Sequence, residues 1–265
     1  MHDPILPTYE LPILPTYELP TLPTYELPTL EHLEISTPKA DVPVLRSIEL
    51  RFPGVPLWPR LIPKWRAAVI ESAGLENNIF HNHQAEGNGT LYRPALIQYR
   101  CAQGCAVLWG MNEGVDALLR WHAEAPESIT LDGRTGKLDT LESKRSRTPL
   151  EMSEDWHYYH ISDYLALNAD NFKKWVAEPR LIGRFELLEK ALAAHLLAFC
   201  KAAGWWLPER LKVEMVEIHQ HKKTHYHQVP LVAFGLTYRC NLKLPDGIAL
   251  GKATSHGFGV QRAAR

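Results

Sequence analysis

One hydrophobic pattern occurs twice along this chain, and that repetition is the strongest constraint on its fold. Residues 44–52 alternate apolar and polar side chains as a half-buried strand does, and residues 60–73 carry apolar side chains at helical spacing up to Gly74. The first set is completed by a predicted hairpin over 94–101 and 105–111, a helix over 112–124 and a strand over 128–132. The order β-α-β-β-α-β is that of a ferredoxin-like unit.

A second set of the same kind follows. A mixed aromatic strand over 156–167 leads to a long helix over 180–203, which ends at Gly204. Two long alternating strands, 211–221 and 229–242, and a final short strand after a Gly-rich turn complete the set. We therefore expect an α+β protein with two tandem ferredoxin-like (β-α-β-β-α-β) units.

Between the two sets the sequence is polar. Residues 133–155 contain few apolar side chains, as inter-domain segments commonly do. The predicted organisation is an N-terminal domain over 42–140, a linker over 141–155 and a C-terminal domain over 156–265.

Residues 1–41 differ from the rest. The octapeptide PILPTYEL and close variants recur from residue 4, with proline every few residues. Proline at this density excludes helix interiors and central strands, which predicts a disordered tail of polyproline character. The alternative is a multivalent docking tract in which Tyr9, Tyr17 and Tyr25 are repeated anchors.

The composition indicates a soluble, cytoplasmic protein. Hydrophobic residues make up 45% of the chain and charged residues 22%. The longest apolar helical stretch, around 191–199, contains His195 and is too short to span a bilayer. The four cysteines form no CxxC pairs, which is typical of reduced thiols rather than of a disulfide framework or a zinc knuckle.

The charge is unevenly distributed. The first 45 residues contain seven acids and one base, a net charge of −6, whereas the whole chain has −1, so the remainder has +5. A mildly basic body is compatible with an anionic partner such as nucleic acid.

Two histidines one residue apart, His81 and His83, follow the first predicted helix. A loop containing Gly87 and Gly89 comes next, and then a strand with Tyr92, Arg93 and Tyr99. Imidazole titrates near neutral pH, at about 6.5, so such a pair could act as general acid and base. The alternative is a solvated surface turn. The literal His-Asn-His is not the signature of the nucleases called HNH, whose residues lie far apart in sequence.

A cluster of histidines occupies residues 218–228, IHQHKKTHYHQ. A hairpin that turned at 222–224 would place His219 opposite His227 and His221 opposite His225. Four imidazoles on one face could bind a divalent metal ion. They could also contact RNA phosphates, or form a solvated hairpin end.

The C-terminal segment 247–259, GIALGKATSHGFG, is rich in glycine but is not a P-loop, because Ala253 replaces the Ser or Thr that would bind Mg²⁺. Its glycines allow close backbone approach to a phosphate, for which Lys252 and Ser255 are possible donors. Arg180 and Arg184, four residues apart at the start of the long helix, also suit a phosphate.

Two of these segments carry a family resemblance. HNHQAEGNGTLYRPALIQYR, residues 81–100, resembles the histidine loop and the following "YPLIQY" strand of the CRISPR-associated repeat-processing endoribonucleases, the sixth Cas family within the RAMP superfamily. ALGKATSHGFGV, residues 249–260, is similar to the glycine-rich loop of that superfamily. Ala95 departs from the strand pattern. The resemblance covers roughly residues 44–262 and implies tandem ferredoxin-like units.

The resemblance implies an endoribonuclease that processes CRISPR precursor RNA within its repeats without a metal or other cofactor. The 2′-hydroxyl would attack, giving 2′,3′-cyclic phosphate and 5′-hydroxyl ends. His81 and His83 would be the acid–base pair, and Tyr92 and Arg93 would orient the phosphate or stabilise its charge. The residues expected to touch RNA are Arg180, Arg184, Lys222, Lys223, Lys252 and Ser255.

Two other functions remain open from the sequence. The first is a non-catalytic RNA-binding RAMP-type subunit of a CRISPR effector complex, which needs no histidine pair. The second is a metal-dependent hydrolase that uses the histidines of 219–227. The expected partner is CRISPR repeat RNA, with other Cas proteins as further partners, in a monomer or homodimer that does not bind membranes.

Overall fold

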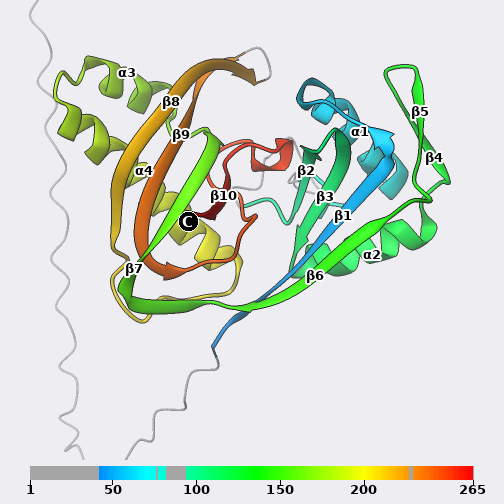
Figure 1. The fold of residues 1–265 in the computed structure, drawn as a ribbon, viewed down its shortest axis with the longest axis horizontal. Helices are drawn as coiled ribbons and strands as arrows, with labels where there is room; N and C mark the ends of the chain where they lie inside the picture. Colours follow the sequence, from blue (N-terminus) through cyan, green and yellow to red (C-terminus); the bar gives the residue numbers. More distant parts are fainter. Residues whose placement is uncertain (1–41, 76, 82–93, 227–228, 265) are drawn as a thin grey trace, which may run out of the picture. The chain divides into compact units, whose positions relative to one another are not determined.

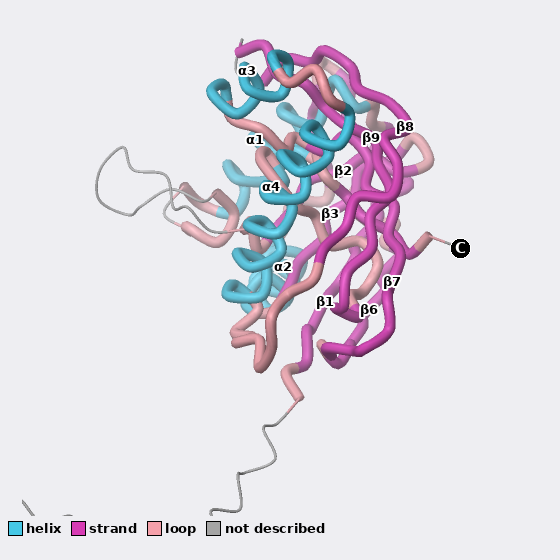
Figure 2. The backbone as a smooth tube through the Cα atoms, turned by 90° about the vertical axis from the view of Figure 1, so that its left-hand side faces the viewer, coloured by secondary structure: helices cyan, strands magenta, loops and turns pink. Residues whose placement is uncertain are grey.

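The computed structural model describes residues 42–75, 77–81, 94–226 and 229–264. The predicted tail, residues 1–41, lies outside them, as do His83, Tyr92, Arg93 and His227. The described chain forms two four-stranded antiparallel sheets and a separate two-stranded hairpin (Figure 1). In Figure 2 the helices lie on one side of the strands.

The first sheet has the strand order β2-β3-β1-β6. Its members are β1 (Val44–Pro56), β2 (Ile97–Ala102), β3 (Cys105–Met111) and β6 (Glu142–Pro149). The connections contain a 3-10 turn η1 (Pro59–Leu61) and the helices α1 (Ile62–Ala73) and α2 (Glu113–Glu124). Alternate residues of β1, including Ile48, Leu50 and Phe52, are fully buried in the core with Trp65 of α1. This is the arrangement predicted from the first hydrophobic set.

The fourth strand of this sheet is not the one predicted. Residues 128–132 contain β4 (Ser128–Leu131), which pairs with β5 (Arg134–Lys137) in the separate hairpin. The strand beside β1 is β6, within the stretch expected to be a linker. None of its eight residues is buried, so an edge strand of this composition has no apolar face that a sequence pattern could reveal.

Residues 141–155 are therefore mostly strand rather than linker. A single residue, Leu150, separates β6 from β7 (Glu151–Tyr164), the first strand of the second sheet. Leu150 is buried, and its N–H donates a hydrogen bond to the carbonyl of Pro43.

The second sheet has the order β10-β7-β9-β8, which is the same topology. It adds β8 (Val213–Tyr226), β9 (Val229–Lys243) and β10 (Val260–Ala263) to β7, and the connection from β7 to β8 contains α3 (Ala169–Ala177) and α4 (Leu181–Ala202). The prediction of two ferredoxin-like units is confirmed, with one difference. The connection from β9 to β10 is the predicted Gly-rich turn, and it contains a 3-10 turn η2 (Thr254–His256) in place of the second helix of a ferredoxin-like unit. Glycines with positive φ, such as Gly251 and Gly259, disfavour a helix there.

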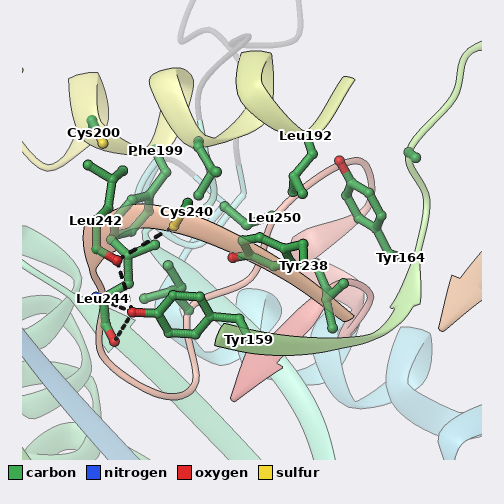
Figure 3. Close-up of a cluster of buried hydrophobic side chains, with 14 of the residues drawn as sticks. Tyr159, Tyr164, Leu192, Phe199, Cys200, Tyr238, Cys240, Leu242, Leu244 and Leu250 are labelled. Atoms are coloured by element: carbon green, nitrogen blue, oxygen red, sulfur yellow. Dashed lines mark hydrogen bonds between the residues drawn. The ribbon is translucent and has the colours of Figure 1, made fainter. Parts of the chain in front are cut away.

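The second core is built mainly by α4 against its sheet (Figure 3). Leu192 and Phe199 of the helix pack with Tyr238 and Cys240 of β9. This cluster also includes residues of the first unit, namely Leu45, Leu96, Trp109 and Met111. The two units therefore share buried surface. Within the described part of the chain, no helix is both long enough and apolar enough to cross a membrane.

Candidate active site

The segment that leads to His81 is a series of tight turns after α1. Gly74 ends the helix with φ of 88°, the N–H of Asn77 bonds to the Gly74 carbonyl at 3.1 Å, and the N–H of Phe80 bonds to the Asn77 carbonyl at 3.1 Å. The Phe80 side chain is 2% exposed and packs in the first core. The chain thus reaches His81 from an anchored residue.

His81 is held at the end of these turns. Its Nε2 donates a hydrogen bond of 2.6 Å to the carbonyl of Leu75, which requires a proton on Nε2. The second predicted histidine, His83, and the predicted orienting residues Tyr92 and Arg93 lie outside the described residues. The distance and orientation between His81 and His83 therefore stay a prediction.

Tyr99 of β2 lies beside this segment. Its side chain is fully buried, and its hydroxyl donates a hydrogen bond of 3.0 Å to the carbonyl of Phe80. Burial raises the pKa of the phenol above its ordinary value, which keeps the hydroxyl protonated as a donor.

A guanidinium that the sequence analysis missed lies over the same ring. Arg66 of α1 has its Cζ 5.9 Å from the centroid of the Tyr99 ring. Its Nε is buried and makes no hydrogen bond within the described residues. In sequence, Arg66 is one polar residue of an amphipathic helix, and only the fold places it next to the histidine segment.

The Gly-rich loop meets the first unit at the same strand. Gly257 lies so close to β2 that a Cβ there would be 3.1 Å from the Tyr99 carbonyl and 3.3 Å from Cδ1 of Ile62. The Ser255 hydroxyl is 3.1 Å from Nδ1 of His256. A cavity of about 500 Å³ opens here, lined by loop residues 256–258 and by Ile62, Arg100 and Cys101. The structure therefore brings the predicted histidine segment and Gly-rich loop to one edge strand.

The part of the loop with Lys252 rests on the end of β7. The N–H of Lys252 donates to the Leu165 carbonyl at 3.2 Å, and Gly251 packs flat against the Tyr164 ring. Burial lowers the pKa of the Lys252 amine. The Tyr164 hydroxyl is 2.6 Å from Nδ1 of His195 on α4.

Arg180 and Arg184 occupy the start of α4 as predicted, and both interact with Glu178. Nε of Arg180 is 2.9 Å from the Glu178 carboxylate, and Nε of Arg184 donates to the Glu178 carbonyl at 2.7 Å. The Arg180 guanidinium holds the pKa of that carboxyl below its usual range. The Arg184 guanidinium also lies 5.2 Å from the ring of Trp175.

The predicted pairing of the hairpin histidines is wrong. Strand β8 continues through residues 222–226, where the sequence analysis placed the turn. His221 is opposite Phe234, and His219 bonds to the Thr237 hydroxyl at 2.7 Å. Across the described residues, no group of three or more histidine, cysteine or acidic side chains is arranged to hold a metal ion.

Two segments that carry predicted RNA-binding cations meet the end of β7, in the upper part of Figure 1. Nζ of Lys222, on β8, is 2.6 Å from the Asp163 carboxylate, and Lys223 follows it as an exposed residue. Lys252 approaches from the loop, bonded to Leu165. The hairpin, through the Lys222 side chain, and the Gly-rich loop, through the Lys252 backbone, thus both contact the chain at the end of β7.

Sequence models of one family match nearly all of the described chain. The model of the Cas6b N-terminal domain matches residues 44–148, and that of the Cas6b C-terminal domain matches residues 151–263. A curated relative, an uncharacterized protein of Methanocaldococcus jannaschii, is 29% identical over 102 residues, which are 38% of this chain and 68% of the relative.

Solved structures show the same fold. A crystal structure of Cas6b is 20% identical, with a TM-score of 0.75 over 83% of this chain and 100% of the other. A second, described as the CRISPR RNA processing endoribonuclease Cas6b, is 18% identical, with a TM-score of 0.65 over the same shares. A type IV Cas6 crRNA endonuclease, Csf5, gives a TM-score of 0.54 at 10% identity, covering 84% of this chain and 100% of the other.

Proposed function

Since this chain belongs to the Cas6b family, we propose that it is an endoribonuclease that cleaves CRISPR precursor RNA within the repeats. One observation supports this most directly. The segment that ends in His81 and the Gly-rich loop, which are far apart in sequence, both contact Tyr99 of β2. The histidine segment and the Gly-rich loop therefore meet at one strand, which supports a site that combines an acid–base group with a loop suited to phosphate.

The proposed reaction needs no metal ion. One histidine of the pair His81 and His83 takes the proton of the 2′-hydroxyl, and the 2′-oxygen forms a bond to the adjacent phosphorus. The bond from phosphorus to the 5′-oxygen breaks, and the other acid–base group donates a proton to that oxygen. The products are a 2′,3′-cyclic phosphate and a 5′-hydroxyl. Each positioned acid or base contributes about 10²- to 10⁴-fold in rate.

The remaining predicted residues would bind and orient the RNA. Tyr92 and Arg93 would hold the scissile phosphate and stabilise the charge that develops on it. The cations around the end of β7 would bind the RNA backbone through Lys252, Lys222 and Lys223, with Ser255 as a further donor. Arg180 and Arg184 would extend this contact along α4, where Glu178 already engages both arginines.

The test uses labelled repeat RNA in EDTA, beside the same RNA with a 2′-deoxy residue at the cleavage position. We expect cleavage of the first RNA and none of the second, because the deoxy residue removes the nucleophile. Replacing both histidines, as His81→Ala with His83→Ala, should reduce cleavage by at least about 10²-fold. His122→Gln on α2 is the control for loss of a histidine elsewhere.

Three results would contradict the proposal in different ways. Full cleavage by the double histidine variant would remove the catalytic assignment. Cleavage that EDTA abolishes would favour the metal-dependent hydrolase. Tight binding of a matched repeat without any cleavage would favour the non-catalytic RNA-binding subunit.

A further inference from the structure

We propose that Tyr99 is a positioning residue of the cleavage site, acting on His81 through the carbonyl of Phe80. The inference rests on the proposed function and gives a role to Tyr99, a residue of the strand motif to which neither the sequence nor the family match assigns one. Tyr99 contacts the histidine segment through its hydroxyl and the Gly-rich loop through its backbone carbonyl.

The hydroxyl contact acts directly on the backbone of His81. The carbonyl that accepts the 3.0 Å hydrogen bond belongs to Phe80, so its oxygen lies in the same peptide plane as the nitrogen and Cα of His81. Because that plane is rigid, fixing the oxygen fixes the direction in which the chain enters His81. The donor is itself immobile, since Tyr99 is fully buried and paired with Leu108 of β3.

Three other hydrogen bonds stabilise this segment without reaching β2. The bonds from Asn77 to Gly74, from Phe80 to Asn77 and from His81 to Leu75 all connect the turns after α1 to one another. The Tyr99 hydroxyl provides a hydrogen bond that ties these turns to β2, in addition to the packing of the Phe80 side chain in the first core. Without it the turns would keep their internal bonds and the packing of Phe80, and would lose the bond that orients this peptide.

The backbone of the same residue supports the Gly-rich loop. A Cβ on Gly257 would be 3.1 Å from the Tyr99 carbonyl, so the loop passes over that peptide in close contact. One residue of β2 thus touches both segments that the proposed reaction needs. Its position sets the distance between the histidine that moves a proton and the loop that holds the phosphate.

The substitution Tyr99→Phe removes the hydroxyl and keeps the ring, including the face over which Arg66 lies. A misplacement of about 1 Å at an acid–base group costs about 10²-fold in rate. We therefore expect single-turnover cleavage at saturating RNA to slow about 10- to 100-fold, with the Kd for RNA changed less than twofold.

Tyr159→Phe is the matched control. Tyr159 is 3% exposed, and its hydroxyl donates to the Leu242 carbonyl at 3.0 Å and accepts from the Leu244 N–H at 2.7 Å (Figure 3). The control therefore loses a buried hydroxyl of the same kind in the second core. Tyr159→Phe should lower Tm at least as much as Tyr99→Phe, because it also removes the acceptor of the Leu244 N–H, yet only Tyr99→Phe should slow cleavage.

A double-mutant cycle with His81→Ala tests whether Tyr99 acts through His81. If it does, Tyr99→Phe slows the wild-type enzyme strongly and slows the His81→Ala enzyme less than twofold. An equal slowing in both backgrounds, a wild-type rate for Tyr99→Phe, or an equal slowing by Tyr159→Phe would each overturn the inference. In all three cases, loss of cleavage in the double histidine variant would leave the proposed function intact. Full cleavage by that variant would instead remove the catalytic assignment of the histidines, on which this inference rests.

Discussion

At the scale of single residues, the pair of Tyr164 and His195 shows how a titratable group is placed beneath the Gly-rich loop. The Tyr164 hydroxyl is 2.6 Å from Nδ1 of His195. Burial, and then the nearby charge of Lys252, lower the pKa of His195 to about 4. Burial raises the pKa of Tyr164, so at neutral pH the phenol donates to a neutral imidazole.

This pair predicts a pH dependence of stability. The folded-state pKa of His195, about 4, is below the ordinary value near 6.5, so between these values the unfolded chain binds a proton that the folded chain does not. The free energy of unfolding should therefore fall as the pH decreases through this window. We expect wild type to lose about 1 to 2 kcal/mol more than His195→Asn between pH 7 and pH 5.

The measurement is urea unfolding of both proteins at the two pH values. Asparagine offers an acceptor near the position of Nδ1 and does not titrate, so it separates the imidazole from the many other groups that titrate in this range. An identical change in wild type and His195→Asn would contradict the assigned pKa.

At the scale of elements, the connection between β9 and β10 is a loop where the first unit has α2. Gly259 has φ of 69°, and a Cβ there would be 1.9 Å from the Leu250 carbonyl, which is too close for any side chain. The N–H of Leu250 in turn donates to the Gly259 carbonyl at 2.9 Å. The loop therefore closes on itself through backbone that tolerates only glycine.

Gly259→Ala should lower the free energy of unfolding by more than the conformational cost of placing alanine at a positive φ. Gly133, at the turn between β4 and β5, has φ of +76° and open space around it, so Gly133→Ala measures the conformational cost by itself. We expect about 1 to 2 kcal/mol from Gly133→Ala and a clearly larger loss from Gly259→Ala, by urea unfolding. Cleavage should be slowed only by Gly259→Ala, and equal losses in both assays would show that the contact with Leu250 is unimportant.

Elements with an apolar face were predictable, and those without one were not. The helix over 180–203 and the alternating strands of both sheets were predicted because their buried side chains repeat at 3.6 or 2 residues. Strand β6 was missed because its eight residues are all exposed or half-exposed and its pairing with β1 comes from backbone hydrogen bonds. The hairpin turn was misplaced because the basic, histidine-rich residues 222–226 resemble a turn while forming the end of β8.

The same difference holds for the candidate site. His81 and the Gly-rich loop could be found as motifs, because their residue types are unusual at that spacing. Tyr99 belongs to the strand predicted after the histidine loop, but its contact with Phe80 could not be predicted. Arg66 looks like an ordinary surface residue until the fold places it over the Tyr99 ring. Long-range contacts of this kind leave no local pattern in a single sequence.

At the scale of the whole described molecule, the proposed RNA-binding cations differ in how far they are already neutralised. Lys222 and Arg180 form ion pairs with Asp163 and Glu178. Lys252 is partly buried near His195, and burial lowers the pKa of its amine. A cation whose charge is costly to bury gains most from a phosphate partner.

Lys252→Gln should therefore weaken RNA binding and reduce its dependence on salt. We expect the slope of log Kd against log salt to fall by roughly 0.7 to 1, the contribution of one phosphate contact. Lys243→Gln is the control, because Lys243 pairs with Glu151 at the opposite end of β7. Filter binding across a range of salt concentrations measures both slopes, and parallel lines for wild type and Lys252→Gln would exclude Lys252 from the interface.

Leu150, the single residue between β6 and β7, limits how far the two sheets can move relative to each other. It is buried and hydrogen-bonded to Pro43, so at this crossing the chain has no slack with which one sheet could swing against the other. Enzymes with hinged domains can select a substrate by closing around it. This joint of the described chain offers no such hinge, so we expect the proposed RNA substrate to be selected by its fit to the two sheets as they already stand.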